Sequence, residues 1–206
     1  MEIGIIGLSQ SGKTTVFNAL TRGRARVAMS TASAKPNIGV AKVPDARLEK
    51  LAEMFKPEKK TPAEVTYTDI PGAPEGLGKQ AGIGGLFLNT LQKTDALLHV
   101  VRAFPDPSVS HIAGSVDPWR DIATLDLELL FSDLGILQRR LEKIEAGMKG
   151  AKPAQREIAE KERVVLDRIK AQLEQNVPLR AQQIAEIDRP LLANYQFLTA
   201  KPLLVV

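Results

Sequence analysis

The residues best suited to chemistry lie at the start of the 206-residue sequence. The pattern G-x-x-x-x-G-K-[ST] is matched at every fixed position by residues 7–14 (GLSQSGKT), directly after the apolar run 3–6. Glycines in such a loop let successive backbone N–H groups point at phosphate oxygens, and the helix that follows adds partial positive charge. Lys13 can reach the β- and γ-phosphates, and the Thr14 hydroxyl can ligate Mg²⁺.

This pattern predicts a loop that binds a nucleoside triphosphate, ATP or GTP, together with Mg²⁺. An ordinary glycine-rich turn is the alternative, which the strand before the loop and the helix after it disfavour. The residues expected to contact the nucleotide are Gly7, Ser9, Gln10, Ser11, Gly12, Lys13, Thr14 and Thr15.

A second chemical signal, D-x-x-G at residues 69–72 (DIPG), closes an expected strand, and Asp69 follows Thr14 by 55 residues. A nucleotidase with a phosphate-binding loop needs this motif at about that distance. Asp69 would hold Mg²⁺ through a water molecule, and the Gly72 amide would contact the γ-phosphate. A turn aspartate followed by a flexible glycine is the alternative. The phosphate-binding loop upstream favours the functional interpretation.

The composition excludes several classes of protein and site. There are no cysteines and two histidines, which excludes disulfides, thiolate metal sites and His-based metal sites. No apolar run approaches the ~20 residues that span a bilayer, and the N-terminus lacks a signal-peptide pattern. We therefore expect a cytoplasmic, monomeric protein without a membrane partner. The net charge of +4 permits a nucleic-acid partner without requiring one.

Strands and helices alternate over the first half of the chain, and these elements must position the two motifs. Strands are expected at 3–6, 38–43, 64–70, 95–101 and 203–206, the last two buried. Helices are expected from Thr15 to about Gly23, at 86–93, and at 46–55 with Leu48, Leu51 and Phe55 on one face. Residues 24–35 are expected to form a mobile loop. The glycine-rich segment 72–85 is expected to be a flexible loop that nucleotide can order. The alternation is typical of an α/β fold with a mostly parallel sheet flanked by helices.

The composition changes near Trp119, where leucine-rich heptads begin. Alternating spacings of three and four residues predict a coiled-coil seam of Leu127, Leu130, Leu134, Leu137, Leu141, Ile144 and Met148. A turn at 149–153 leads to a second amphipathic helix, whose expected apolar face holds Ile158, Val165, Ile169 and Leu173. We therefore expect an antiparallel helical hairpin inserted into the α/β fold, with domains at 1–118, 119–195 and 196–206.

The expected hairpin is basic. Residues 138–171 hold ten Lys/Arg and six Asp/Glu, a difference equal to the net charge of the whole chain, and no aromatic residue. A basic rod without aromatic side chains favours contact with an RNA phosphate backbone over base reading. A solvated coiled-coil surface, with charges paired along the helices, is an equally good interpretation.

Several motifs together resemble the Obg-like ATPases, the YchF subfamily of translation-factor GTPases. Besides the phosphate-binding loop and the hairpin, they are FNALT (17–21), PNIGV (36–40), PDARL (44–48), LAE (51–53), DIPG (69–72), HVVR (99–102), His111, GSVDP (114–118) and LTAKP (198–202). The resemblance spans the chain and implies a GTPase-type α/β fold with an inserted coiled coil, hydrolysis of ATP or GTP, and association with ribosomes. The family's base-recognition motif and TGS domain are absent, so we expect a chain truncated before both.

The resemblance also implies a further metal ligand, because Ser33 aligns with the loop threonine that ligates Mg²⁺ in the family. Two stretches depart from the family pattern. Ser9-Gln10-Ser11 stands where the family usually has Pro-Asn-Val, and Pro71-Gly72-Ala73 stands where it has Ala-Gly-Leu.

Hydrolysis is expected to be slow, because many GTPases place Gln directly after D-x-x-G to orient the attacking water, and Ala73 cannot do so. Lys13 and His111 are the catalytic candidates. His111 lies in an expected loop at a position that the resemblance marks, and a histidine without a role is the alternative. We expect a nucleotide switch that hydrolyses faster on its partner, the ribosome.

Two other functions compete with the switch. One is an RNA- or ribosome-binding module, in which the basic hairpin carries the function and hydrolysis is negligible. The other is a P-loop kinase, which the D-x-x-G spacing and the absence of an acceptor-binding lid disfavour.

Overall fold

The computed structural model describes residues 1–23, 36–71 and 85–206. The expectations for Ser33, Gly72, the loop 24–35 and most of the glycine-rich segment fall outside these ranges. The described chain forms two compact units. The first combines Met1–Gly72, Thr94–Val116 and Leu203–Val206, and the second combines Ala73–Lys93 and Asp117–Pro202. These divisions lie near the expected domain boundaries at 118/119 and 195/196, which stay a prediction.

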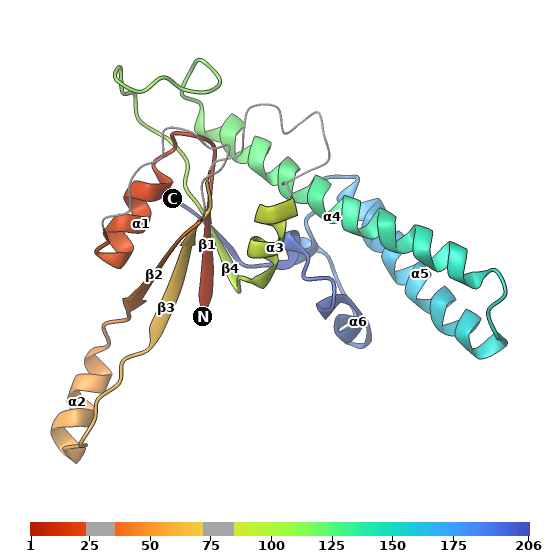
Figure 1. Ribbon diagram of the computed structural model, residues 1–206, viewed down its shortest axis with the longest axis horizontal. Helices are drawn as coiled ribbons and strands as arrows, with labels where there is room; N and C mark the ends of the chain where they lie inside the picture. The colour runs from red at the N-terminus through yellow and green to blue at the C-terminus, as the bar shows by residue number, and fades with distance from the viewer. Residues whose placement is uncertain (24–35, 72–84) are drawn as a thin grey trace. The chain divides into compact units, whose positions relative to one another are not determined.

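The first unit is built on a five-stranded sheet with the order β2-β3-β1-β4-β5 (Figure 1). Its strands are β1 (Glu2–Ile6), β2 (Asn37–Lys42), β3 (Glu64–Asp69), β4 (Ala96–His99) and β5 (Leu203–Val205). The central β1 pairs in parallel with β3 and β4, β4 pairs in parallel with β5, and β2 pairs antiparallel with β3. The predicted α/β class with a mostly parallel sheet is therefore confirmed.

The carboxyl end of β1 is anchored in the core of this unit. Ile5 packs with Leu98 and Val100 and with Phe17, which comes from helix α1 (Lys13–Thr21). Ile5 is fully buried and Phe17 is 3% exposed. The loop between β1 and α1 is therefore held at both ends by side chains of one hydrophobic cluster.

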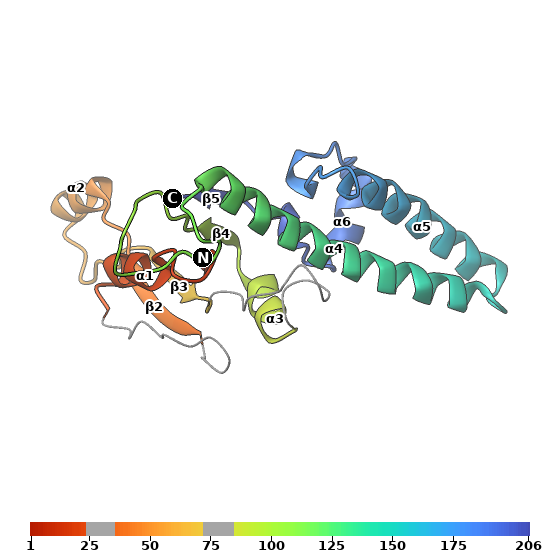
Figure 2. The ribbon, with the colours of Figure 1, turned by 90° about the horizontal axis from the view of Figure 1, so that it is seen from above.

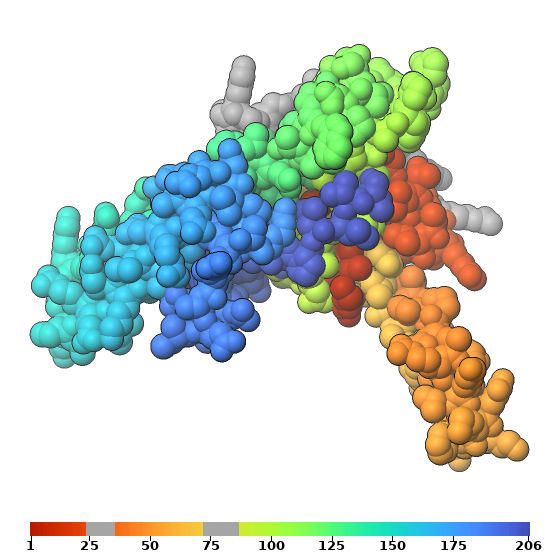
Figure 3. All heavy atoms as spheres, turned by 180° about the vertical axis from the view of Figure 1, so that it is seen from behind, coloured from red at the N-terminus to blue at the C-terminus, as the bar shows by residue number. Residues whose placement is uncertain are grey.

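Two elements of this unit are more exposed than their sequence suggests. Helix α2 (Ala46–Phe55) has the predicted bounds, and it lies beyond the ends of β2 and β3 (Figures 1 and 3). Of its expected apolar face, Leu51 and Phe55 are 52% and 74% exposed, and Leu48 is half-buried. The prediction of a buried final strand is wrong, because β5 is the edge strand and Leu204 is 62% exposed.

The second unit is helical. Its described residues form α3 (Gly85–Lys93), α4 (Pro118–Met148), α5 (Pro153–Leu173), α6 (Arg189–Ala193) and the 3₁₀ turns η2 (Leu179–Ala181), η3 (Glu186–Asp188) and η4 (Leu198–Ala200). Helix α4 begins after Asp117, whose side chain accepts a hydrogen bond from the Arg120 N–H, and Pro118 takes the first helical position. Helices α4 and α5 lie side by side and antiparallel (Figures 1 and 2), as the predicted hairpin requires.

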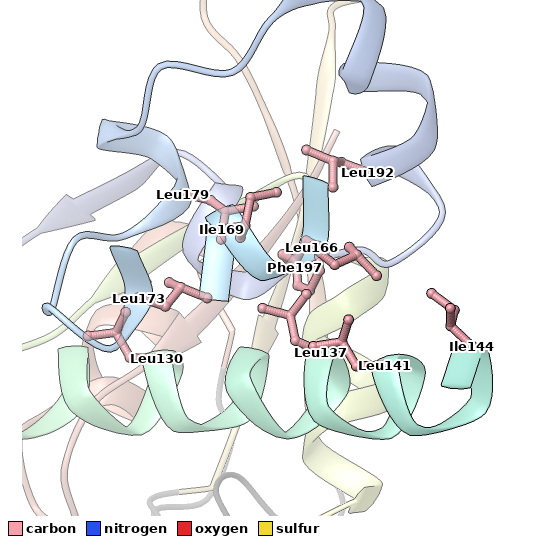
Figure 4. Packing of buried hydrophobic residues seen from close by; sticks show 10 residues of the cluster. All are labelled: Leu130, Leu137, Leu141, Ile144, Leu166, Ile169, Leu173, Leu179, Leu192 and Phe197. Carbon is pink, nitrogen blue, oxygen red and sulfur yellow. The ribbon is translucent and has the colours of Figure 1, made fainter. Parts of the chain in front are cut away.

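The seam of the hairpin continues into the segments that follow α5 (Figure 4). The buried cluster consists of Leu130, Leu137, Leu141, Ile144, Leu166, Ile169, Leu173, Leu179, Leu192 and Phe197. The predicted face of α5 is wrong at Ile158, which is 69% exposed, and it omits Leu166, which is fully buried. The seam also contains Glu162, a charged residue that a pattern based on hydrophobic residues alone does not include.

Glu162 can lie in the seam because its charge is paired. The Arg140 guanidinium donates to both carboxylate oxygens, at 2.6 and 2.7 Å, and the Tyr195 hydroxyl donates to one of them. The hydrogen bonds from Arg140 lower the pKa of Glu162 below its usual range, against the opposing effect of burial. Burying an unpaired carboxylate between two helices would be costly. The bidentate guanidinium partner satisfies both carboxylate oxygens and so allows the charge to lie there.

Candidate nucleotide-binding site

The loop between β1 and α1 turns sharply enough to surround an anion. Its backbone has positive φ at Gly7 (151°), Gln10 (62°) and Gly12 (99°). The Ser11 N–H donates to the Leu8 carbonyl at 3.3 Å, which closes the turn. Helix α1 begins at Lys13, directly after the loop, so its N-terminal N–H groups face the space that the loop encloses.

Gly7 is required by packing as well as by its backbone angle. A Cβ at this position would lie 2.3 Å from the Val100 carbonyl oxygen and 2.8 Å from Ser11 Oγ. The backbone therefore passes directly over the end of β4. At Gly12 the space beside the Cα is open, and only the positive φ favours glycine.

Lys13 is buried at the base of the loop. The residue is only 7% exposed, and its Nζ donates a hydrogen bond to the Leu8 carbonyl oxygen at 2.7 Å. Burial lowers the pKa of Lys13 to about 8, and the negative charge of Asp69 partly opposes this shift. A partly desolvated ammonium group, held by a loop carbonyl, is placed to exchange that contact for phosphate oxygens.

The structure brings the two sequence motifs together. Thr14 Oγ1 donates to Asp69 Oδ2 at 2.8 Å, across 55 residues of sequence. The register explains the contact, because Asp69 lies beside Ile5 on parallel strands and both strands end at the same edge of the sheet. The chain crosses from one side of β1 to the other here, at the switch point where ligands bind in open α/β sheets.

The Asp69 carboxylate has the character of a metal-holding group. It is 3% exposed, and its Oδ2 also accepts a hydrogen bond from Asn37 Nδ2 at 3.2 Å. Its Oδ1 is buried and has no hydrogen-bond partner among residues 1–23, 36–71 and 85–206. Mg²⁺ prefers oxygen ligands and retains several waters, so a hydroxyl beside a carboxylate with a spare buried oxygen fits it.

The other predicted nucleotide-binding residues are placed by the loop itself. Ser11 is 6% exposed, and its hydroxyl has no partner in the described part of the chain. Gln10 and Thr15 are exposed, and Ser9 is half-buried. Gly72 and Ser33 lie outside the described residues, so their contacts with the γ-phosphate and with Mg²⁺ stay predictions.

His111 lies in the loop between β4 and α4. The Ala113 N–H donates to His111 Nδ1 at 3.1 Å, and the Gly114 N–H donates to the His111 carbonyl at 2.9 Å. Because Nδ1 is occupied by the Ala113 N–H, Nε2 is the ring nitrogen that this turn leaves for other contacts. The role of His111 in hydrolysis stays a prediction.

Two side chains that sequence reasoning did not assign to the site take part in its structure. One is Asn37, which contacts Asp69. The other is Arg102, 4% exposed, whose guanidinium donates to the carbonyls of Phe104, Asp106 and Val109 and so shapes the loop that carries His111. Both fall in stretches that carry the family resemblance, PNIGV and HVVR, and that was their only sequence signal.

Comparison with known proteins places the site in a family. Residues 2–131 match the family model described as 50S ribosome-binding GTPase. The ribosome-binding ATPase YchF of Bacillus subtilis (strain 168) is 38% identical over 207 residues, covering 100% of this chain and 56% of the relative. Obg-like ATPase 1 of Caenorhabditis elegans is 36% identical over 204 residues, covering 98% of this chain and 51% of the relative.

A solved structure agrees with these matches. The Schizosaccharomyces pombe YchF GTPase superposes with a TM-score of 0.79 at 30% identity, over 100% of this chain and 55% of that one. The chain thus spans about half the length of the curated relatives it matches. The chain belongs to the ribosome-binding GTPase family and is a homologue of the YchF and Obg-like ATPases, with their P-loop GTPase fold.

Proposed function

We propose that this chain binds ATP or GTP with Mg²⁺, hydrolyses it slowly, and acts as a ribosome-associated nucleotide switch in the cytoplasm. The observation that carries the proposal is the joining of Thr14 and Asp69 by a 2.8 Å hydrogen bond beside the buried Lys13. A metal-ligating hydroxyl, a metal-holding carboxylate and a phosphate-binding ammonium group then meet at one end of the sheet. The names of the relatives, ribosome-binding ATPase and Obg-like ATPase, support the same function.

Each residue would have a distinct task. The loop N–H groups and Lys13 would bind the phosphates, and Thr14 and Asp69 would hold Mg²⁺, directly and through water. Mg²⁺ would neutralise charge on the phosphate oxygens. With Ala73 after D-x-x-G, intrinsic turnover is expected at or below the roughly 10⁻⁴–10⁻³ s⁻¹ of an unassisted GTPase.

The binding step is tested with a matched pair of threonines on α1. Titration of ATP and of GTP, with and without Mg²⁺, would be compared for the wild type, Thr14→Val and Thr21→Val. Thr21 Oγ1 donates to the Phe17 carbonyl within the helix, away from the loop. We expect Thr14→Val to lose most of the strengthening by Mg²⁺ and Thr21→Val to keep it. A wild type that binds neither triphosphate would refute the proposal.

His111 is proposed to orient the attacking water through its Nε2. Two substitutions separate this role from loop structure. His111→Asn can still accept the Ala113 N–H, which now bonds Nδ1, but lacks Nε2, whereas His111→Gln offers an amide near the Nε2 position. We expect His111→Asn to abolish ribosome-stimulated turnover with nucleotide affinity unchanged, and His111→Gln to retain part of it. Normal stimulated turnover in His111→Asn would remove His111 from the mechanism.

A second candidate function, RNA binding by the hairpin, is favoured by the distribution of its charges. Five of the ten basic residues in 138–171 form ion pairs, among them Lys161–Glu157, Arg163–Glu160 and Lys170–Glu174. Five exposed basic residues form no ion pair within the described ranges: Arg139, Lys143, Lys149, Lys152 and Arg156. They lie in the last turns of α4, the connecting turn and the start of α5, and here they are called the tip cations.

The tip cations are tested by salt dependence. We would compare the variant Lys149→Ser/Lys152→Ser/Arg156→Ser with Lys161→Ser/Arg163→Ser/Lys170→Ser, which removes equal charge at paired positions. If the tip contacts phosphates, the slope of log K against log salt for ribosomal RNA should fall by about 2–3 in the first variant. Little change is expected in the second. Equal salt slopes in the two variants would show that the tip cations make no special contact with RNA phosphates and are simply solvated.

A further inference from the structure

Asp69 is held by a donor from β2 as well as by Thr14. Asn37 is the first residue of β2, it lies opposite Asp69 in the antiparallel pairing with β3, and its Nδ2 donates to Asp69 Oδ2 at 3.2 Å. We propose that Asn37 is a positioning residue for the Mg²⁺-holding carboxylate. The inference rests on the proposed function, because it concerns the same metal site.

Both donors act on the same carboxylate oxygen. Thr14 Oγ1 and Asn37 Nδ2 reach Oδ2 from α1 and from β2, at 2.8 and 3.2 Å. Two donors from different elements fix the plane of the carboxylate, which could otherwise rotate about its Cβ–Cγ bond. The remaining oxygen, Oδ1, is buried and has no hydrogen-bond partner in the described residues, so it is the one kept available for metal-bound water.

Asn37 suits this task because an amide can donate without adding charge. A lysine or arginine at the same position would compete with Mg²⁺ for the Asp69 carboxylate, and an aspartate would repel that carboxylate. Partners that orient a ligating carboxylate without touching the metal commonly change metal affinity by roughly 10- to 100-fold when they are removed. Asn37 would therefore act on the metal through Asp69.

The alternative is that Asn37 serves only the β2–β3 pairing. That pairing uses backbone groups along six residue pairs, from Asn37↔Asp69 to Lys42↔Glu64. Removing the Asn37 side chain leaves these backbone groups in place. A purely structural role would therefore lower stability and all forms of nucleotide binding together, without a specific effect of Mg²⁺.

The test measures the Mg²⁺ dependence of nucleotide binding in the 206-residue chain. A fluorescent ATP or GTP analogue would be titrated in EDTA and at increasing Mg²⁺, for the wild type, Asn37→Ala, Asn37→Leu and Val40→Ala. Val40 is on the same strand, is 52% exposed and pairs with Thr66, so its variant controls for weakening of β2. Urea unfolding of each variant, without nucleotide, measures stability separately.

We expect both Asn37 variants to need roughly 10-fold or more Mg²⁺ for half-maximal strengthening, with affinity in EDTA unchanged and Val40→Ala like the wild type. Wild-type Mg²⁺ dependence in the Asn37 variants would overturn the inference and leave the proposed function standing. A parallel loss in EDTA and in Mg²⁺, matched by lower stability, would also overturn it. A wild type without Mg²⁺-dependent binding would refute the proposed function, and this inference with it.

Discussion

At the scale of single residues, the phosphate-binding loop depends on its two glycines for different reasons. Gly7 lies against the end of β4, where a Cβ would be 2.3 Å from the Val100 carbonyl oxygen. Gly12 has open space beside it but a φ of 99°, which L side chains rarely adopt. One glycine is therefore required by its neighbours and its backbone together, and the other by its backbone alone.

Substituting alanine at the two positions should separate these costs. Gly12→Ala is expected to lower the free energy of unfolding by about 1–2 kcal/mol, the cost of a left-handed residue. Gly7→Ala is expected to cost about 3 kcal/mol or more, because overpacking against a backbone carbonyl is added to the backbone strain. Urea denaturation of both variants checks the difference. Equal losses would show that the loop moves freely off β4.

Lys13 should make nucleotide affinity depend on pH. Its pKa is lowered to about 8 by burial, and bound phosphate favours its charged form. Above pH 8 nucleotide binding must therefore add a proton to Lys13. The dissociation constant should be flat below pH 8 and rise by up to about tenfold per pH unit above it.

Two measurements check the Lys13 prediction. Nucleotide titrations from pH 7 to 9.5 give the pH profile, and calorimetry in two buffers of different ionisation enthalpy gives the proton uptake. Lys13→Arg is the control, because its guanidinium stays charged throughout this range. Its profile should lack the rise, whatever its absolute affinity. The same rise in both proteins would assign the titration to another group.

At the scale of elements, the sequence predicts where helices and strands begin and end better than it predicts which of their side chains are buried. The strands, α2 and the hairpin follow from periodicity and capping residues, and the Thr14–Asp69 contact follows from two motifs at the ends of parallel strands. Burial depends on partners that periodicity does not show. Glu162 enters the seam only because Arg140 and Tyr195 pair with it, and Asn37 joins the site only through strand register.

The corrected face of α5 leads to a prediction about the hairpin. Leu166 is fully buried in the hydrophobic cluster, whereas Ile158 is 69% exposed. Leu166→Ala should lower the free energy of unfolding by about 2–5 kcal/mol, as buried leucines do. Ile158→Ala should change it by no more than about 0.5 kcal/mol. Chemical denaturation of the two variants checks this, and comparable losses would restore the face predicted from the sequence.

At the scale of the whole molecule, the chain passes between the two units at four points, the last after Pro202. Among the described residues, none of the helices combines the length and the apolar composition that a membrane span requires. The segment before the last crossing is held by Asp133, a fully buried residue of α4. Its carboxylate accepts hydrogen bonds from the N–H groups of Leu198 and Thr199, at 2.9 and 2.8 Å, and from Thr199 Oγ1 at 2.7 Å. The chain then enters β5.

Asp133 should give the stability of the chain a specific pH dependence. Burial raises the pKa of Asp133 from 3.8 to about 6, against the opposing effect of the bonds from Thr199 and Leu198. Because the folded state holds this proton more tightly than the unfolded state, the stability that it contributes is complete below about pH 4. That stability is lost as the pH rises through 6, and the shift corresponds to roughly 3 kcal/mol.

Urea unfolding of the wild type and Asp133→Asn between pH 4 and 7 isolates this contribution, because the amide does not titrate. The stability advantage of the wild type over the variant should be largest near pH 4 and shrink by roughly 2–3 kcal/mol by pH 7. The exposed Asp167→Asn is the control, because it removes a carboxylate at the surface of the hairpin instead of the buried one. An advantage that grows with pH would show that the three donors outweigh burial. Asp133 would then hold residues 198–199 most tightly as an ionised carboxylate.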